Sequence, residues 1–405
     1  FIAGPRHLQL QVPESGFPYL LSVRFHHYCS TASQGLGAVR DNDTIRGLEG
    51  VQEEEKRFSG DFANHPRTRH LGAHFCMTYT HPMRLVFMGT PEFAIPVLAR
   101  LLDAGHVVAG VVTRPDRPAG RGRGLSQPPI KTYAKNQNIE VLQPLTLKQA
   151  DAVKAIADLK PEAIVVAAYG QILPEAVLSI PPRGILNVHP SLLPRHRGPS
   201  PVITTLLEGD QETGVTIMVL DEGMDTGPIL AQRRTHPEAR ESTGDLTKRL
   251  FDLGAELLLD VLPDWERGFL SASPQDKSGV TVTRRISKLD GEVAWETDAT
   301  AIERCIRAFD PWPGCFTRWR GKTLRVLGGE VIDVPVLGGL PGDVVSVGVG
   351  HGASEKEGIA GAEAAVMTGD GALRLLRLQM EGRRVQSAQE FLRGHPEFVG
   401  SRLPS

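Results

Sequence analysis

Short apolar runs alternate with helical patterns from residue 83 to about residue 271, and this alternation limits the possible folds more than any other feature. Residues 163–168 are apolar throughout, which is typical of a strand buried on both faces of a parallel sheet. Parallel strands need crossover connections, and helical patterns at residues 148–159 and 201–208 supply them. The sequence therefore predicts a doubly wound, mostly parallel α/β sheet. Its strands are expected at residues 84–88, 107–113, 140–142, 163–168, 184–189 and 215–220.

The pattern changes after a long amphipathic helix expected at residues 243–268. Residues 271–279 are rich in Ser, Pro, Asp and Gly, which is typical of a linker. Beyond Ile286, a short helix and the breaker Pro311-Trp312-Pro313-Gly314 precede short β runs that are separated by glycines. We expect an N-terminal extension over 1–82, an α/β domain over 83–271, a linker over 272–285 and a smaller β-barrel domain over 286–405.

Composition argues against several classes of protein. The net charge is −2, so a nucleic-acid-binding surface would have to come from local clustering of basic residues. Four cysteines, with no Cys-x-x-Cys pair, favour neither a disulfide framework nor a zinc or redox motif. No apolar run in the sequence approaches the roughly 18 residues that cross a bilayer. We therefore expect a protein of a reducing compartment, with no metal, no membrane span and no DNA partner.

Residues 1–82 are the least informative part of the chain. They hold seven of the 13 histidines, including His65, His70 and His74, but the spacing matches no metal-ligand pattern. They lack the plan of a signal peptide, and the acidic run at residues 53–55 is unlike an organelle transit peptide. We expect a dispensable, disordered extension or a start assigned too early, with Met77 or Met83 as the true beginning.

Three polar side chains are expected to meet at one edge of the sheet. Asn187 and His189 are two residues apart in a short strand that stops at Pro190, so they project to the same side. Asp225 lies in the Gly- and Asp-rich turn after the next strand. Ligands of open α/β sheets bind beyond the carboxyl ends of the strands. Because neither Ser nor Cys is obviously paired with the histidine, the three residues suit direct acyl transfer better than covalent catalysis.

A long connection over residues 113–140 is rich in arginine and glycine. Loops longer than about 12–15 residues are usually functional or disordered. Glycine lets such a loop move and arginine binds phosphates, so a nucleic-acid contact is one interpretation. A solvated flexible loop is the other. The basic residues considered are Arg114, Arg117, Arg121, Arg123 and Lys131.

Motifs along residues 83–402 resemble those of the methionyl-tRNA formyltransferase family, a branch of the folate-dependent formyltransferases. The Asn-x-His…Asp set marks the wider superfamily, and the loop beginning Arg114-Pro-Asp-Arg-Pro-Ala-Gly-Arg-Gly marks the tRNA branch. Two positions depart from the family pattern: His196 replaces an aromatic residue, and Gly124 replaces a lysine. The other matching motifs include Met88-Gly-Thr-Pro-Glu-Phe93, Ala168-Tyr-Gly-Gln-Ile-Leu-Pro174, Arg307-Ala-Phe-Asp-Pro-Trp-Pro-Gly314 and Gln379-Met-Glu-Gly-Arg-Arg384.

The resemblance implies a Rossmann-like catalytic domain and an OB-like barrel that binds tRNA. It also implies transfer of the formyl group of 10-formyltetrahydrofolate to the α-amino group of initiator methionyl-tRNA. A carboxamide suits the developing oxyanion, an imidazole suits proton transfer, and a carboxylate favours the protonated imidazole; we assign these roles to Asn187, His189 and Asp225. The resemblance places folate at Ser191, Leu192, Leu193, Pro194, Tyr169, Gly170, Ile172 and Leu173, and tRNA at Arg117, Arg121, Arg123 and Lys131.

Other interpretations stay open from the sequence. A formyltetrahydrofolate hydrolase or a sugar-nucleotide formyltransferase would share the three residues, but the Arg/Gly loop and a β-rich second domain argue against both. A catalytically inactive RNA-binding protein would not need Asn187, His189 and Asp225. We expect a monomer of the bacterial cytoplasm, or of an organelle matrix if residues 1–82 include a targeting segment.

Overall fold

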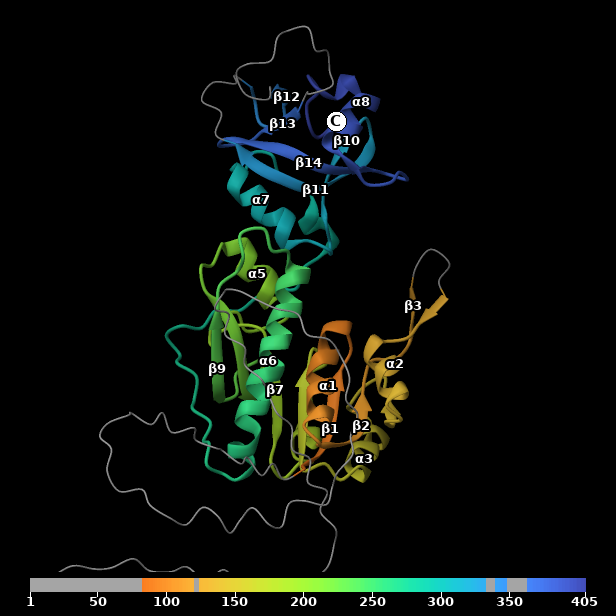
Figure 1. Ribbon diagram of the computed structural model, residues 1–405, viewed down its shortest axis with the longest axis vertical. Helices are drawn as coiled ribbons and strands as arrows, with labels where there is room; N and C mark the ends of the chain where they lie inside the picture. Colours follow the sequence, from red (N-terminus) through yellow and green to blue (C-terminus); the bar gives the residue numbers. More distant parts are fainter. Residues whose placement is uncertain (1–81, 120–123, 333–338, 348–362) are drawn as a thin grey trace, which may run out of the picture. The chain divides into compact units, whose positions relative to one another are not determined.

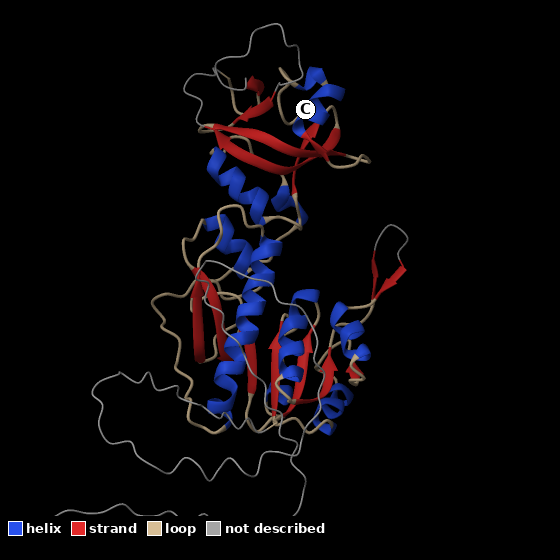
Figure 2. Ribbon diagram, viewed as in Figure 1, coloured by secondary structure: helices blue, strands red, loops and turns tan. Residues whose placement is uncertain are grey.

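The computed structural model describes residues 82–119, 124–332, 339–347 and 363–405 (Figure 1). Almost all of the expected N-terminal extension, and both Arg121 and Arg123, lie outside these ranges. The described residues belong to one compact unit that contains two large sheets (Figure 2). Among the helices of these ranges, none is long and apolar enough to cross a membrane.

Seven strands form the first large sheet, in the order β5-β2-β1-β6-β7-β8-β9. The strands from β5 to β7 run parallel, whereas β8 is antiparallel to β7 and β9 is antiparallel to β8. The predicted mostly parallel α/β sheet is confirmed. Its strands are β1 (Arg84–Gly89), β2 (Val107–Val112), β5 (Val141–Leu142), β6 (Ala163–Ala167), β7 (Ile185–His189), β8 (Thr213–Val219) and β9 (Ile229–Thr235).

Two apolar clusters lie on opposite faces of this sheet. Along β1, Leu85 and Phe87 belong to one cluster while Val86 and Met88 belong to the other, as the alternation of strand side chains requires. Helices α1, α2 and α6 contribute to the first cluster, and α3 and α4 contribute to the second. The helices of this domain are α1 (Ile95–Asp103), α2 (Pro129–Asn136), α3 (Ala150–Asp158), α4 (Glu175–Leu178), α5 (Pro201–Glu208) and α6 (Thr243–Glu266).

Helix α6 packs closely against β7 and β8. Ser242 caps its first turn by accepting a hydrogen bond from the Asp245 N–H group. Midway along the helix, a Cβ atom on Gly254 would collide with Val188 Cγ1 and lie 2.9 Å from Val215 Cγ2. A residue without a side chain therefore lets α6 rest directly on β7 and β8 and fix their position.

A second, antiparallel sheet forms the C-terminal domain, as the sequence predicts. Its main path is β10-β11-β14-β13-β12, with β15 paired to β14, which is consistent with a barrel-like domain. Edge-to-face contacts among Trp319, Phe391 and Phe398, with ring centroids 5.2 to 5.8 Å apart, lie in its core. The elements are α7 (Ala299–Ala308), β10 (Cys315–Trp319), β11 (Lys322–Ile332), β12 (Val344–Val347), β13 (Glu363–Met367), β14 (Ala372–Met380), β15 (Gln386–Ser387) and α8 (Ala388–Gly394).

The two domains contact each other through helices α5, α6 and α7. Thr243 Oγ1 donates a hydrogen bond of 2.7 Å to the carbonyl oxygen of Ala308. This bond lies beside an apolar cluster that both domains share, so the contact does not depend on the linker alone. The exact domain boundaries at residues 271 and 285 stay predictions. The shared cluster consists of Val202, Leu206, Leu246, Leu250 and Ala308.

We expect Gly254→Ala to destabilise the protein by about 1–3 kcal/mol, because the added Cβ atom overpacks the contact between α6 and Val188. The matched control is Gly394→Ala in α8, where an added Cβ atom meets no atom within 4 Å. Chemical denaturation of both variants measures the difference in unfolding free energy. Equal stability of the two variants would contradict the close packing of α6.

Candidate active site

Strand β7 carries the first two predicted catalytic residues on one face. Asn187 and His189 lie two residues apart and are 9% and 4% exposed. Within the described ranges, the carboxamide of Asn187 has no hydrogen-bond partner. Most buried polar side chains are paired, so an unpaired and nearly buried amide is available to a bound molecule.

The ring of His189 is held through one of its two nitrogens. Its Nε2 atom lies 3.0 Å from the backbone carbonyl oxygen of His196. A carbonyl oxygen can only accept a hydrogen bond, so Nε2 carries a proton in this arrangement. Nδ1, which lies 3.6 Å from Asp225 Oδ1, is left as the nitrogen that can exchange a proton.

The route by which Asp225 reaches His189 differs from the one that the sequence suggests. Strand β8 is antiparallel to β7, and its last residue, Val219, pairs with Leu186 rather than with His189. The turn after β8 therefore starts at the opposite end of β7 from His189. The loop over residues 220–228 folds back and brings the carboxylate to the ring. The two side chains do lie together, but the argument from aligned strand ends is wrong.

The sequence of this loop explains how it folds back. Asp221 Oδ1 accepts hydrogen bonds from the Gly223 N–H group at 3.1 Å and from Thr226 Oγ1 at 2.7 Å, which closes a tight turn. Asp225 has a φ of 54°, a left-handed conformation that aspartate adopts more readily than most residues. A Cβ atom on Gly227 would collide with a backbone carbonyl oxygen of β8, so the return path needs glycine there.

Gln275 lies in the segment expected to be a linker. Its side chain connects the loop over residues 220–228 with Arg197, which follows β7 in the chain. Its Nε2 donates hydrogen bonds to the carbonyl oxygens of Asp225 at 2.9 Å and Gly227 at 2.7 Å. Its Oε1 accepts from the Arg197 guanidinium at 3.0 and 2.7 Å. The Gly198 N–H group donates to Asp225 Oδ2 at 2.8 Å. The sequence analysis missed Gln275, because residues 271–279 have the composition of a linker and contain no motif that would single out this glutamine.

The turn after β7 contains half of the predicted folate-binding residues. Ser191 and Leu193 are buried, and their backbone groups already bond within the protein. Thr216 Oγ1 donates to the Ser191 carbonyl oxygen at 2.6 Å and accepts from the Leu193 N–H group at 3.1 Å. Leu192 and Pro194 are half-buried. The Leu193 N–H group is therefore already paired, and binding of folate through this turn stays a prediction.

Two of the other four predicted folate residues lie at a hollow of ≈ 450 Å³, which neither Ile172 nor Leu173 lines. Tyr169 and Gly170 line it, Leu173 is buried, and Ile172 is 77% exposed. The Tyr169 hydroxyl is buried without a partner in the described part of the chain, and burial raises the pKa of Tyr169 to about 12. Arg114 Nη1 donates a hydrogen bond of 2.7 Å to the Gly170 carbonyl oxygen, which ties the Arg/Gly loop to this hollow.

Two of the four predicted tRNA-binding residues can be placed. Arg117 is exposed in β3 (Arg117–Ala119), which pairs with β4 (Gly124–Ser126), and it lines the same hollow. Lys131 is only 8% exposed, and its Nζ atom lies 2.7 Å from both carboxylate oxygens of Asp116. Hydrogen bonds from Gln143 and then from Lys131 hold the pKa of Asp116 below its usual value. Lys131 therefore already has a partner at the base of the loop, and its contact with tRNA stays a prediction.

Comparisons with known proteins show the family. The formyl transferase profile matches residues 83–262, and the profile of the formyl transferase C-terminal domain matches residues 285–396. The methionyl-tRNA formyltransferase of Chloroflexus aurantiacus is 47% identical over 313 residues, which are 77% of this chain and 97% of that relative. The one of Roseiflexus sp. is 46% identical over 330 residues, with 80% of this chain and 95% of the relative covered. The chain belongs to the methionyl-tRNA formyltransferase family.

Solved structures share the fold of this formyltransferase at low sequence identity. HypX from Aquifex aeolicus, in complex with tetrahydrofolic acid, has a TM-score of 0.53 at 19% identity and covers 78% of this chain. The chain spans about half the length of HypX, 48% of it. An N-formyltransferase from Helicobacter canadensis, in complex with folinic acid and dTDP-3-aminofucose, has a TM-score of 0.51 at 17% identity and covers 72% of this chain and 98% of its own.

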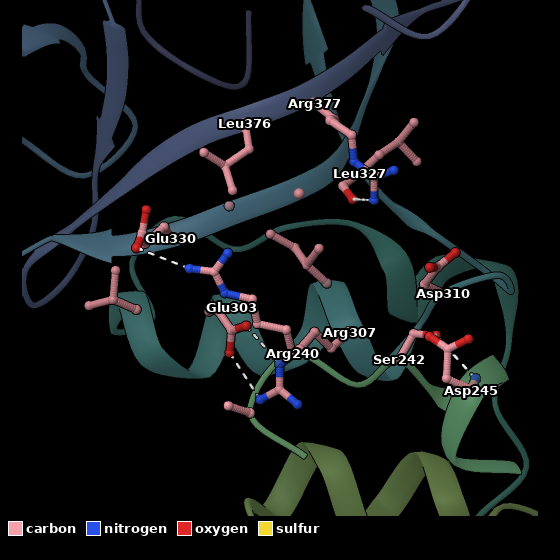
Figure 3. Close-up of a pocket in the computed structure, with 15 residues that line it drawn as sticks. Arg240, Ser242, Asp245, Glu303, Arg307, Asp310, Leu327, Glu330, Leu376 and Arg377 are labelled. Carbon is pink, nitrogen blue, oxygen red and sulfur yellow. Dashed lines mark hydrogen bonds and ion pairs between the residues drawn. The ribbon is translucent and has the colours of Figure 1, made fainter. Parts of the chain in front are cut away.

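A second hollow, of ≈ 470 Å³, is an alternative place for the chemistry of this formyltransferase. It lies between residues 239–245 and elements α7 and β11 of the C-terminal domain (Figure 3). None of the three predicted catalytic residues lines it, and none lines the hollow at Tyr169 either. Four of its charged groups form two ion pairs, Arg240 with Glu330 at 3.5 Å and Arg307 with Glu303 at 2.7 Å. The unpaired amide and the His–Asp pair favour the end of β7 instead.

We expect Gln275→Leu to lower the kcat of formyl transfer about tenfold, which corresponds to about 1.4 kcal/mol, because Asp225 and Arg197 lose a shared partner. The KM for folate should change little, since Gln275 does not line the hollow of Tyr169 and Gly170. The control is Gln137→Leu, an exposed glutamine at the end of α2. Steady-state kinetics of both variants measure the effect. Equal kcat for the two variants would remove Gln275 from the support of the site.

Proposed function

We propose that this chain transfers the formyl group of 10-formyltetrahydrofolate to the α-amino group of initiator methionyl-tRNA, with Asn187, His189 and Asp225 as catalytic residues. Family membership supports the reaction. One observation supports the residues: Asp225 Oδ1 lies 3.6 Å from Nδ1 of His189, and His189 shares strand β7 with the unpaired Asn187 carboxamide. We further propose that the enzyme acts as a monomer without a metal, in the bacterial cytoplasm, on tRNA and not on DNA.

Asn187 acts on the charge that develops on the formyl oxygen. Bound 10-formyltetrahydrofolate supplies a formyl group, whose oxygen becomes negative as the amine of methionyl-tRNA adds to its carbon. The Asn187 Nδ2–H group donates a hydrogen bond to that oxygen. One such donor contributes about 3–4 kcal/mol to the stability of a transition state. The amide is ready for this role because it has no protein partner to leave first within the described residues.

His189 carries the proton that the reaction moves. A bond forms between the amine nitrogen and the formyl carbon, and the bond from that carbon to N10 breaks. The amine loses one proton and N10 gains one, so a single residue can take the proton and return it. Nδ1 of His189 suits this exchange, since Nε2 stays bonded to the His196 carbonyl oxygen at 3.0 Å. The Asp225 carboxylate stabilises the positive ring between the two steps.

The hollow beside the Arg/Gly loop is the proposed folate site. Its volume of ≈ 450 Å³ lies within the range of about 300–1,000 Å³ that is typical of small-molecule pockets. Tyr169 and Gly170 offer an aromatic ring and backbone at its wall. Arg117, exposed at the same hollow, suits a phosphate of the tRNA acceptor end, and Arg121 and Arg123 extend the same loop in the sequence.

We expect Asn187→Ala, His189→Ala and Asp225→Ala to lower kcat far more than they weaken folate binding, because each residue acts on charge that appears only in the transition state. For Asn187→Ala the loss should be about 10²–10³-fold. The control is Asn136→Ala, an exposed asparagine at the end of α2. Steady-state kinetics and folate titration of each variant measure the two effects. A variant with near-wild-type kcat would remove that residue from the mechanism.

A direct assay decides between the proposed function and its alternatives. The full chain is incubated with 10-formyltetrahydrofolate and, in separate reactions, with methionyl-tRNA, with an amino-sugar nucleotide or with water alone. Formyl transfer to methionyl-tRNA alone supports the proposal. Release of formate in water at a comparable rate, or formylation of the sugar, would replace it with one of the two related activities.

A further inference from the structure

The carbonyl oxygen that holds His189 belongs to His196, whose backbone has a left-handed conformation. His196 has a φ of 57°, which a residue with a side chain adopts at a cost of about 1–2 kcal/mol. Such a conformation persists only where surrounding groups hold it. The ring of His196 is itself buried, at 3% exposure, although histidine is not an apolar side chain. The partners of that ring therefore decide whether the carbonyl oxygen stays directed at His189.

Asp210 binds the side chain of His196 and that of the residue before it. Asp210 Oδ2 lies 2.6 Å from His196 Nε2, and Asp210 Oδ1 accepts from Arg195 Nη2 at 2.8 Å. One carboxylate therefore binds two consecutive side chains. On the other side, the His196 N–H group donates to Thr281 Oγ1 at 2.7 Å. Glu208, the remaining acid nearby, lies farther away, 3.9 Å from the His196 ring.

We propose that Asp210 and His196 are positioning residues for His189, an inference that rests on the proposed function of that histidine. Asp210 holds the His196 ring, and the peptide of His196 is thereby kept with its carbonyl oxygen against His189 Nε2. This contact selects the neutral ring form that carries its hydrogen on Nε2. It leaves Nδ1 unprotonated and able to take the proton of the attacking amine.

The competing ring form shows why this selection matters. Asp225 lies on the Nδ1 side of His189, and a carboxylate there favours a hydrogen on Nδ1. Without the His196 carbonyl oxygen, the neutral ring would place its hydrogen toward Asp225. Nδ1 could then no longer accept a proton. The His196 carbonyl and the Asp225 carboxylate therefore favour opposite forms of the neutral ring and act together only on the charged one.

A metal ion is the other occupant that these side chains suggest. One ligand atom each from His196, Glu208 and Asp210 lies within 4.8 Å of the others. However, the guanidinium of Arg195 lies 2.8 Å from Asp210 and 3.6 Å from Glu208, so a positive charge already neutralises both acids. The bond of 2.6 Å between His196 and Asp210 also fills the space between two of the three ligands. Positioning explains these contacts better than metal binding does.

The test uses the full chain with two substitutions of His196 that differ in one property. His196→Phe keeps a ring of similar size and loses the donor to Asp210, whereas His196→Gln places an N–H donor close to the position of Nε2. We expect His196→Phe and Asp210→Asn to lower kcat about tenfold or more, with less than twofold change in the KM for folate and for methionyl-tRNA. His196→Gln should recover most of kcat. Glu208→Gln is the control and should keep the wild-type kcat.

Nitrogen NMR of the chain labelled with ¹⁵N-histidine reads the ring form directly, and the signal missing from His189→Ala assigns His189. The wild type should show the hydrogen of neutral His189 on Nε2, and Asp210→Asn and His196→Phe should shift it toward Nδ1. Thermal unfolding identifies variants that fail to fold, in which case Asp210→Asn and His196→Gln still test the proposal. This readout needs no turnover, so it stands even if methionyl-tRNA is not the substrate.

Three outcomes would overturn the proposal. The first is an unchanged His189 ring form in both Asp210→Asn and His196→Phe. The second is a loss of kcat in His196→Gln as large as in His196→Phe, which would indicate packing rather than the donor. The third is activity that EDTA removes and added Zn²⁺ restores, which would indicate a metal site. Activity that is unchanged by EDTA and by Zn²⁺ supports the positioning role.

Discussion

The antiparallel pairing of β8 with β7 is the constraint on which the rest of the site depends. It sets Thr216 opposite His189, so that the threonine hydroxyl reaches the Ser191 carbonyl oxygen and the Leu193 N–H group beyond the end of β7. It also directs the chain after β8 away from His189. Asp225 can reach His189 only because the loop after β8 folds back, and residues outside both strands must hold that loop in place. Gln275 does so by donating hydrogen bonds to two carbonyl oxygens of the loop.

Local pattern was enough to predict six of the seven strands of the first sheet, and β9 was not predicted. The strands expected at residues 84–88, 107–113, 163–168 and 184–189 agree with β1, β2, β6 and β7 to within one residue at each end. The direction of β8 could not be predicted, because an apolar run has the same composition in a parallel and an antiparallel strand. The juxtaposition of His189 and Asp225 was nevertheless expected, since family resemblance carries it independently of the strand direction.

Contacts between side chains that are far apart in the sequence also could not be predicted. Lys131 lies in an arginine-rich segment, and the sequence alone favours a phosphate contact for it. Its bond to Asp116, 15 residues away, gives it a partner that the sequence does not point to. Gln275 lies 50 residues from Asp225, in a stretch whose composition suggests only a connection. Each of these roles depends on which groups the folded chain brings together, and neither residue has a neighbouring residue that reveals it.

The contacts of residues 272–285 determine where the two halves of the chain can be exchanged with those of other proteins. Helix α6, the last helix of the first domain, ends at Glu266, but Gln275 and Thr283 bond back to Arg197, the residue after His196. In a hybrid protein whose halves are joined at residue 271, the positions of Gln275 and Thr283 would come from the other protein. A hybrid joined after residue 285 would keep both residues. The transplantable catalytic unit therefore includes the segment that, by its composition, belongs to neither domain.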